Sequence, residues 1–297
     1  MRWSKRAAAL LASLLLFSTV VQAEGVGKAP AVKERPAVNT RLTAPVEERD
    51  KLQELMVITP EPVKLPETAK SPETAKSPEA KAPEAAGKEE KGERTPAFPE
   101  AEDWQILLVN PWNEMPEDYE VTLKTLSDGN KVDERAYDDL TAMLEACREA
   151  GLRPRICSSY RTQSKQTYLY NNKITRLRNA GYSRKAAEAE AGRWVARPGT
   201  SEHQLGLAVD IVSQSYQALT KKQEKTKEQK WLMEHCWEYG FILRYPNDKS
   251  EITGIGYEPW HYRYVGKDVA LDIRDSGLCM EEYLLLREET LAAEKRA

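Results

Sequence analysis

Residues 201–210 read Ser-Glu-His-Gln-Leu-Gly-Leu-Ala-Val-Asp, a run in which apolar residues alternate with small or acidic ones. Side chains of a strand point alternately to its two faces, so the leucines and the valine can enter a core. Gly206, Ala208 and Asp210 then share the opposite face. A carboxylate inside an apolar strand is costly unless a cation meets it. We therefore expect Asp210 to be a metal ligand, with His203 reaching the same ion from the preceding loop.

A second histidine motif, Glu-Pro-Trp-His, occupies residues 258–261. In a strand through this segment, the aromatic residues pack one way, and His261 and Arg263 face the other way. A catalytic zinc site uses three protein ligands and keeps one position for water, and a separate carboxylate then serves as general base. Two imidazoles, Asp210 and Glu258 can fill these roles together. Taken singly, each residue is more often structural, as a hydrogen-bonded histidine, a salt-bridged aspartate or a surface glutamate.

The two motifs together resemble a known family. Ser-x-His-x-x-Gly-x-Ala-x-Asp followed by Glu-x-Trp-His is similar to the D-alanyl-D-alanine carboxypeptidases of the vancomycin-resistance type, within the zinc peptidases named for lysostaphin, D-Ala-D-Ala peptidases and sonic hedgehog. Further blocks that resemble the family are Ser158-Ser-Tyr-Arg-Thr162, Tyr239-Gly-Phe-Ile-Leu-Arg-Tyr-Pro246 and Tyr257-Glu-Pro-Trp-His-Tyr-Arg-Tyr-Val-Gly266. The resemblance covers roughly residues 133–266, and its strength lies in the order and spacing of the blocks.

The resemblance implies a role for each site residue. His203, Asp210 and His261 are the implied zinc ligands, and Glu258 is the implied catalytic base. Arg161 either stabilises the charge on the scissile carbonyl oxygen or pairs with a substrate carboxylate. The implied substrate contacts are Tyr160, Gln166 and Ser201. Nitrogen and oxygen ligands also suit other divalent ions, so the resemblance is what favours zinc.

The implied function is removal of the terminal D-alanine from peptidoglycan stem peptides. An L,D-carboxypeptidase, a D-Ala-D-Ala dipeptidase and a peptidoglycan endopeptidase can share the same ligands, and the sequence leaves these alternatives open. A non-catalytic binding module with a structural zinc is the alternative from another class. The presence of Glu258 argues against it, because a structural site needs no base.

The first part of the chain reads as an export signal followed by a spacer. Residues 1–23 combine basic residues, an apolar run and a small-residue cleavage motif, which predicts a signal peptide, with an uncleaved membrane anchor as the alternative. Residues 24–98 are rich in Pro, Ala, Glu and Lys, with a repeat that reads Leu-Pro-Glu-Thr-Ala-Lys at 65–70. Such a segment buries too little apolar surface to fold, so we expect a disordered linker. The expected location is therefore extracytoplasmic, in the cell wall or the periplasmic space.

Composition limits the partners. The chain has 44 Lys and Arg against 47 Asp and Glu, a near-neutral balance that argues against nucleic-acid binding. No apolar run is long enough for a conventional membrane span, so we expect no stable span after signal cleavage. We also expect a monomer. Four cysteines in an exported chain predict disulfides, with Cys147–Cys157 the favoured pair and buried free thiols as the alternative. His235 lies in an expected helix and is left out of the site.

The folded domain is expected over residues 99–297, as a single catalytic domain. Helices and short strands alternate there without the rhythm of a parallel sheet, so we expect an α+β fold, a small antiparallel sheet flanked by helices. The expected helices are 133–150, 163–179, 183–195, 225–239 and one from Met280. The expected strands are 104–109, 119–126, 155–159, 205–212, 241–245 and 260–265.

Overall fold

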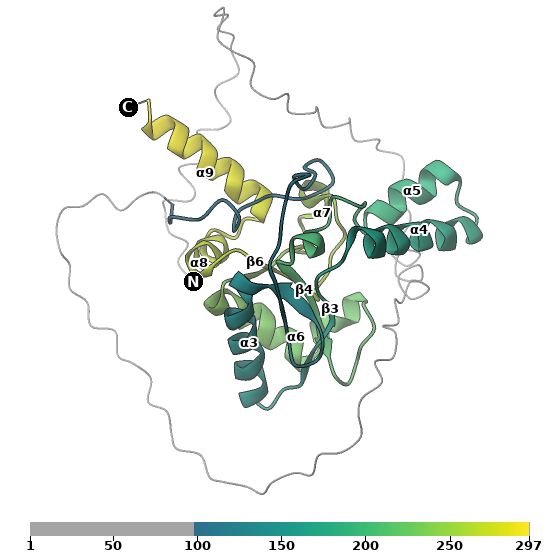
Figure 1. The fold of residues 1–297 in the computed structure, drawn as a ribbon, viewed down its shortest axis with the longest axis horizontal. Helices are drawn as coiled ribbons and strands as arrows, with labels where there is room; N and C mark the ends of the chain where they lie inside the picture. The colour runs from purple at the N-terminus through teal and green to yellow at the C-terminus, as the bar shows by residue number, and fades with distance from the viewer. Residues whose placement is uncertain (1–97, 297) are drawn as a thin grey trace, which may run out of the picture.

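A four-stranded antiparallel sheet lies at the centre of the computed structural model, which describes residues 98–296 (Figure 1). The strand order is β3-β4-β6-β5. The four strands are β3 (Pro154–Ser158), β4 (Ala208–Ser213), β5 (Phe241–Leu243) and β6 (His261–Tyr264). A separate hairpin pairs β1 (Leu123–Thr125) with β2 (Lys131–Asp133). The predicted α+β fold with a small antiparallel sheet is confirmed. The predicted signal peptide and linker lie outside the described residues, apart from Phe98.

Helices surround this sheet. They are α3 (Glu134–Glu149), α4 (Gln163–Asn179), α5 (Arg184–Gly192), α6 (Lys227–His235), α7 (Ser250–Thr253), α8 (Lys267–Ser276) and α9 (Met280–Glu294). Short 3-10 helices occupy Glu202–Leu205, Lys221–Lys225 and Cys236–Tyr239. Figure 1 shows α4 and α5 as a hairpin projecting to one side of the sheet, while α3 and α6 lie close together below it. Helix α8 was not predicted, and the predicted helix 225–239 is divided between α6 and a 3-10 turn.

Strand register places the polar residues of three strands in one row. Ser158 of β3 pairs with Asp210 of β4, and Asp210 in turn pairs with His261 of β6. Alternate residues of the same strands, such as Val209 and Tyr262, enter the main hydrophobic core with residues of α3 and α6. One face of the sheet is therefore apolar and packed, and the other presents the row that contains Asp210 and His261.

Two expected strands near the start of the domain differ from the structure. Residues 104–109 form no strand, because the buried Arg263 guanidinium donates to the carbonyl oxygens of Gln105 and Leu107 at 3.1 and 3.0 Å. These carbonyl groups therefore bond to a side chain and not to a neighbouring strand. In the predicted strand 119–126, only β1 is extended and paired.

The predicted disulfides are wrong. All four cysteines are free thiols in the structure. Cys147 is fully buried on α3, and Cys157 directs its Sγ to the carbonyl oxygen of Asp210 at 3.4 Å. Burial raises the pKa of the Cys147 thiol to about 12. The cysteines thus pack as small apolar side chains, which was the alternative from the sequence.

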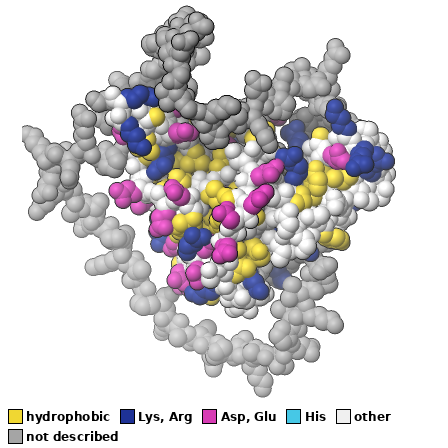
Figure 2. Space-filling model, turned by 45° about the horizontal axis from the view of Figure 1, so that its top comes forward, with side chains coloured by type: hydrophobic (Ala, Val, Ile, Leu, Met, Phe, Trp, Pro, Cys, Tyr) yellow, Lys and Arg dark blue, Asp and Glu magenta, His cyan; other side chains and the backbone are white. Residues whose placement is uncertain are grey.

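Surface features agree with the near-neutral composition. Figure 2 shows acidic and basic side chains interspersed on the face that it draws, with basic groups over the α4–α5 hairpin. Among the described residues, no helix combines the length and the apolar character that a membrane crossing requires.

Candidate metal and catalytic site

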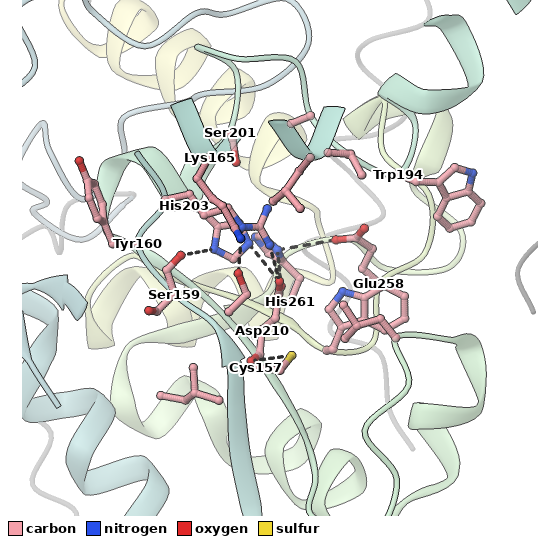
Figure 3. Close-up of a pocket in the computed structure, with 18 of the residues that line it drawn as sticks. Cys157, Ser159, Tyr160, Lys165, Trp194, Ser201, His203, Asp210, Glu258 and His261 are labelled. Carbon is pink, nitrogen blue, oxygen red and sulfur yellow. Dashed lines mark hydrogen bonds and ion pairs between the residues drawn. The ribbon is translucent and has the colours of Figure 1, made fainter. Parts of the chain in front are cut away.

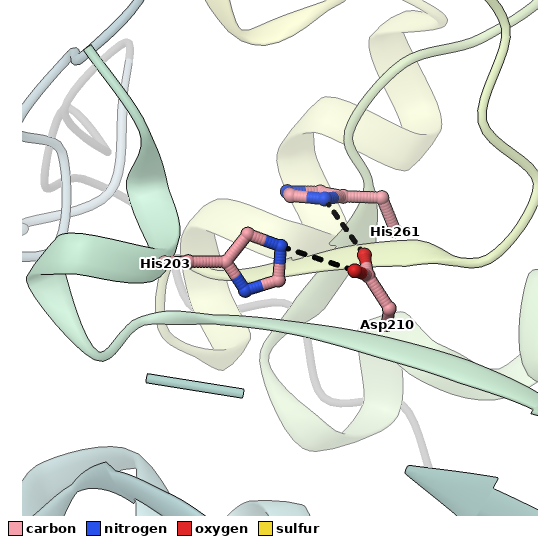
Figure 4. Close-up of side chains that lie close together, drawn as sticks. All are labelled: His203, Asp210 and His261. Carbon is pink, nitrogen blue, oxygen red and sulfur yellow. Dashed lines mark hydrogen bonds and ion pairs between the residues drawn. The ribbon is translucent and has the colours of Figure 1, made fainter. Parts of the chain in front are cut away.

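His203, Asp210 and His261 converge in one buried cluster, as the sequence predicted (Figure 4). The 3-10 helix 202–205 supplies His203, and the paired strands β4 and β6 supply the other two. Nε2 of His203 lies 3.3 Å from Oδ2 of Asp210, and Nδ1 of His261 lies 3.1 Å from Oδ1. One donor atom from each residue lies within 4.8 Å of the other two. This spacing suits three ligands that share one ion.

The hydrogen bond of His203 leaves its Nε2 atom available to a metal. Its Nδ1 lies 2.9 Å from the carbonyl oxygen of Ser159, which can only accept, so Nδ1 carries the hydrogen. Burial, with the nearby charge of Arg161, lowers the pKa of His203 to about 4. The imidazole is therefore neutral at pH 7, and its Nε2 lone pair points at the carboxylate of Asp210.

His261 has the opposite orientation. Its Nε2 lies 3.4 Å from Oε2 of Glu202, so Nδ1 faces Asp210. Burial lowers the pKa of His261, but contacts with the carboxylates of Asp210 and Glu202 outweigh burial and raise it to about 9. The metal-free site therefore favours a protonated His261, and a metal cation held by His261 and Asp210 would take the place of this proton.

The donor set fits a zinc ion. Two ring nitrogens and a carboxylate oxygen match the ligand types and the number of a catalytic zinc site. The Nε2 lone pair of His203 and Oδ2 of Asp210 are both acceptors, yet they lie 3.3 Å apart with no proton to share. Such a pair of acceptors in a buried site repels unless a cation lies between them. A divalent ion held by His203, Asp210 and His261 satisfies all three groups.

Glu258 lies beside this cluster (Figure 3). Its Oε2 is 3.6 Å from Nδ1 of His261, and the residue is 7% exposed. Burial, together with the negative charge of Asp210, raises the pKa of Glu258 to about 8, although His261 acts in the opposite direction. The carboxyl group is thus suited to take up a proton near neutral pH and to release it again.

Arg161 follows β3 and is the cation nearest to the cluster. Its Nη2 donates to Oδ2 of Asp210 at 2.8 Å, and its Nε donates to Oγ of Ser158 at 2.9 Å. Nη1 lies 3.4 Å from Oε1 of Gln166. These bonds fix the guanidinium beside the His-Asp-His cluster and leave some of its N–H groups free for a substrate oxygen.

The residues predicted to contact substrate have different surroundings. A cavity of about 460 Å³ is lined by the catalytic cluster together with Tyr160 and Ser201. Gln166 is fully buried, and its amide nitrogen donates to the carbonyl oxygen of Ala196 at 2.6 Å. Both ends of the Gln166 amide therefore have protein partners, and they orient Arg161. In the view of Figure 3, Tyr160 lies on one side of the cluster, and Glu258 and Trp194 lie on the other.

Glu202 is a site residue that the sequence reasoning missed. It is 1% exposed and accepts from Arg244 at 2.8 Å and from Arg263 at 2.9 Å. Burial alone would raise the pKa of Glu202, but the two guanidinium groups hold it well below its usual value. Arg244 also pairs with Glu281 of α9 at 2.7 Å, so a buried ion network joins the C-terminal helix to His261. The sequence feature that could have pointed to Glu202 is its position directly before His203.

His235 lies away from this cluster, as expected. It ends α6, where its Nδ1 pairs with Glu238 at 2.8 Å and its ring packs against Trp231.

The chain is similar in sequence to known proteins. A family model described as VanY, D-alanyl-D-alanine carboxypeptidase, matches residues 129–267. A D-alanyl-D-alanine carboxypeptidase of Enterococcus faecalis is 45% identical over 183 residues, which are 62% of this chain and 66% of that protein. This chain thus spans slightly less than two thirds of the length of that relative.

Solved structures give the same result. The structure of VanYB in complex with D-alanine-D-alanine is 46% identical, with a TM-score of 0.57, and the match covers 61% of this chain and 97% of that one. A mutant of the vancomycin resistance D,D-pentapeptidase VanY, solved in complex with Zn(II), is 45% identical with a TM-score of 0.56. That match covers 61% of this chain and 99% of the other.

Proposed function

Because the chain belongs to the VanY family of D-alanyl-D-alanine carboxypeptidases, we propose that it removes the terminal D-alanine from peptidoglycan stem peptides. One observation carries the proposal: a buried His-Asp-His ligand set and a separate buried carboxylate, Glu258, line the same cavity. A structural metal site has no use for that carboxylate, whereas a hydrolase does.

The chain's own residues supply most of the chemistry. His203, Asp210 and His261 would hold the zinc ion, which when bound acidifies water and polarises a carbonyl group. Glu258 takes a proton from the attacking water, and the hydroxyl group adds to the carbon of the scissile peptide bond. Glu258 then returns the proton to the nitrogen of the departing D-alanine, and the C–N bond breaks.

Arg161 serves the oxyanion in this proposal. The guanidinium is held by Asp210 and Ser158, so its position is set before substrate arrives. A preorganised donor beside the reacting carbonyl stabilises the negative charge that develops on the oxygen. Tyr160 and Ser201 line the cavity and are proposed to contact the peptide, while Gln166 acts by holding Arg161.

Substrate processing by the zinc-loaded chain tests the proposal. Synthetic stem pentapeptides and tetrapeptides are incubated with the chain, with and without a chelator, and the products are identified by mass. The proposal predicts loss of one D-alanine from the pentapeptide only, and no reaction after chelation. Release of the D-Ala-D-Ala dipeptide, or trimming of the tetrapeptide, would support one of the alternative cuts instead.

This function also requires that the chain reach the cell wall. The predicted signal peptide 1–23 supports export. The predicted linker 24–98 would act as a spacer that lets the folded domain reach its substrate. The cavity of one chain contains the metal-binding cluster, Glu258 and Arg161. We therefore propose that a monomer is active.

A further inference from the structure

Lys173 is a buried cation in the cavity that holds Glu258 and His261. It lies on α4, on the face that also buries Gln166 and Leu177, and is 6% exposed. Its side chain lines the same cavity as Glu258 and His261. A lysine this buried is rare unless its charge has a partner. Lys173 therefore calls for an explanation.

The described part of the chain offers Lys173 no counter-ion. Among residues 98–296, no carboxylate oxygen lies within the 4.0 Å of an ion pair from its ammonium group. The nearest defined contact is the ring of Trp194, whose centroid lies 5.9 Å away. Burial, followed by the charge of Arg176, lowers the pKa of Lys173 to about 8, although the more distant charges of Glu190 and Glu258 act in the opposite direction. The group is therefore still charged at pH 7. The structure thus keeps a poorly solvated positive charge beside the reaction centre.

The charge balance of the cavity indicates what this cation meets. The basic residues of the lining are Arg155, Arg161, Lys165 and Lys173, whereas its acids are Asp210 and Glu258. Arg161 is bonded to Asp210, and Lys165 is exposed. Lys173 is the buried cation of the four that has no carboxylate partner among the described residues, so an anionic group of the ligand fits it best.

The position of Lys173 indicates which anionic group. Its ammonium group lies over the ring of Trp194, and Figure 3 shows Trp194 and Glu258 on the same side of the cluster. Glu258 returns a proton to the nitrogen of the departing residue in the proposed reaction. The free carboxylate of that residue is two bonds from the same nitrogen, and a residue spans only about 3.8 Å. A cation on the Glu258 side of the cavity is therefore within reach of the terminal carboxylate.

We propose that Lys173 binds the free C-terminal carboxylate of the substrate and so restricts the site to removal of a terminal residue. The inference rests on the proposed function, which it deepens by assigning the group that recognises a chain end. Binding gives the buried ammonium an ion-pair partner, and an internal peptide bond has no such partner to offer.

The test compares two ligands that differ only in the charge of the chain end. Pentapeptides ending in D-Ala-D-Ala acid and D-Ala-D-Ala amide are given to zinc-loaded wild type and to Lys173→Met, which keeps the length of the side chain without its charge. Lys173→Met should lose about 10- to 100-fold in kcat/KM on the acid, chiefly through KM, as expected for a charged hydrogen bond. On the amide it should change less than about threefold. Lys185→Met, an exposed lysine of α5, serves as the matched control.

Two kinetic outcomes would overturn the inference. An equal loss on both peptides would mean that Lys173 acts through Glu258 or through the fold, and an unchanged rate on the acid would mean that another group binds the carboxylate. Calorimetry on the Glu258→Gln background, with D-alanyl-D-alanine and its amide, gives a readout independent of turnover. Lys173→Met should weaken binding of the acid only, and failure of Glu258→Gln to bind the acid at all would also overturn the inference. Acid binding by a wild type that cleaves neither peptide would contradict the proposed function but leave the role of Lys173 standing.

Discussion

The Nε2 atom of His261 lies 3.4 Å from Oε2 of Glu202, a fully buried carboxylate that also pairs with Arg244 and Arg263. A metal-bound histidine commonly donates its second N–H to such a group, which fixes the tautomer and the direction of the ring. Glu202 therefore directs Nδ1 of His261 toward Asp210. Through Arg244 and Glu281, it also connects the metal site to α9.

Replacing Glu202 should weaken metal binding. Glu202→Gln keeps the size of the side chain but removes the charge that orients His261 and balances two buried guanidinium groups. We expect zinc affinity to fall about 10- to 100-fold. The free energy of unfolding should fall on the order of 3 kcal/mol. Competition with a chromogenic chelator measures the first quantity, and denaturant unfolding of the metal-free chain measures the second.

Glu281→Gln is the matched control for this experiment. It removes a carboxylate from the far side of Arg244 and leaves the contact between Glu202 and His261 in place. It should lower stability with little change in zinc affinity. Identical zinc affinities for Glu202→Gln and wild type would rule out the positioning role.

Glu258→Gln should separate metal binding from catalysis. The amide cannot take a proton from water, so turnover should fall by about 10²- to 10⁴-fold. Zinc should stay bound, since Glu258 is not among the three ligands. Because burial raises the pKa of Glu258, a neutral amide should not destabilise the metal-free chain near pH 7. Metal analysis, peptide kinetics and thermal unfolding check these points, and wild-type turnover in this variant would refute the assignment of the base.

Arg161→Met should lower kcat and spare the metal. Its guanidinium is proposed to stabilise the oxyanion, and loss of one such donor costs about 10²- to 10³-fold in kcat. Asp210 keeps its contacts with both histidines in this variant, so bound zinc should remain near one per chain. If Arg161 bound the terminal carboxylate instead, the loss would appear in KM and would vanish for an amidated peptide.

The buried charge of Lys173 should be visible in the dependence of stability on pH. Its pKa is lowered from 10.5 to about 8 in the folded chain, so between these values the unfolded chain binds more protons. The contribution of Lys173 to the free energy of unfolding therefore rises with pH between about 8 and 10.5. At lower pH the lysine is charged and destabilises the folded chain. Lys173→Met should be more stable than wild type at pH 7, on the order of 3 kcal/mol, and the difference should shrink toward pH 10.5. Denaturant unfolding at several pH values gives the comparison, and a constant difference would contradict it.

The sequence predicted the parts of the site that rest on strand alternation and on short motifs. Asp210 and His261 were expected on the polar face of their strands, and the structure pairs them directly. Arg263 was expected to face the same way, but its partner Glu202 could not be predicted. A buried ion pair depends on long-range packing, and here it brings together Glu202, Arg263 and the carbonyl groups of residues 105 and 107. The same long-range contacts explain why residues 104–109 are not a strand, although their apolar character favours one.

For the helices too, the sequence predicted local structure but not long-range packing. A helix was expected over roughly residues 163–179, and the structure has it at Gln163–Asn179, where Thr162 caps its start by accepting from Lys165 N–H. Lys173 has no such local signal, since a lysine on a helix normally faces solvent. Its burial results from the packing of the α4–α5 hairpin over the cavity, which the sequence did not reveal.

X-ray absorption at the zinc edge of the loaded chain tests the central claim most directly. The account predicts one ion per chain with two imidazole nitrogens at about 2.0–2.1 Å, one carboxylate oxygen and an additional light atom. His235→Ala should leave this spectrum unchanged, and Asp210→Ala should abolish tight binding. Sulfur scattering at about 2.3 Å, or a third imidazole, would contradict it.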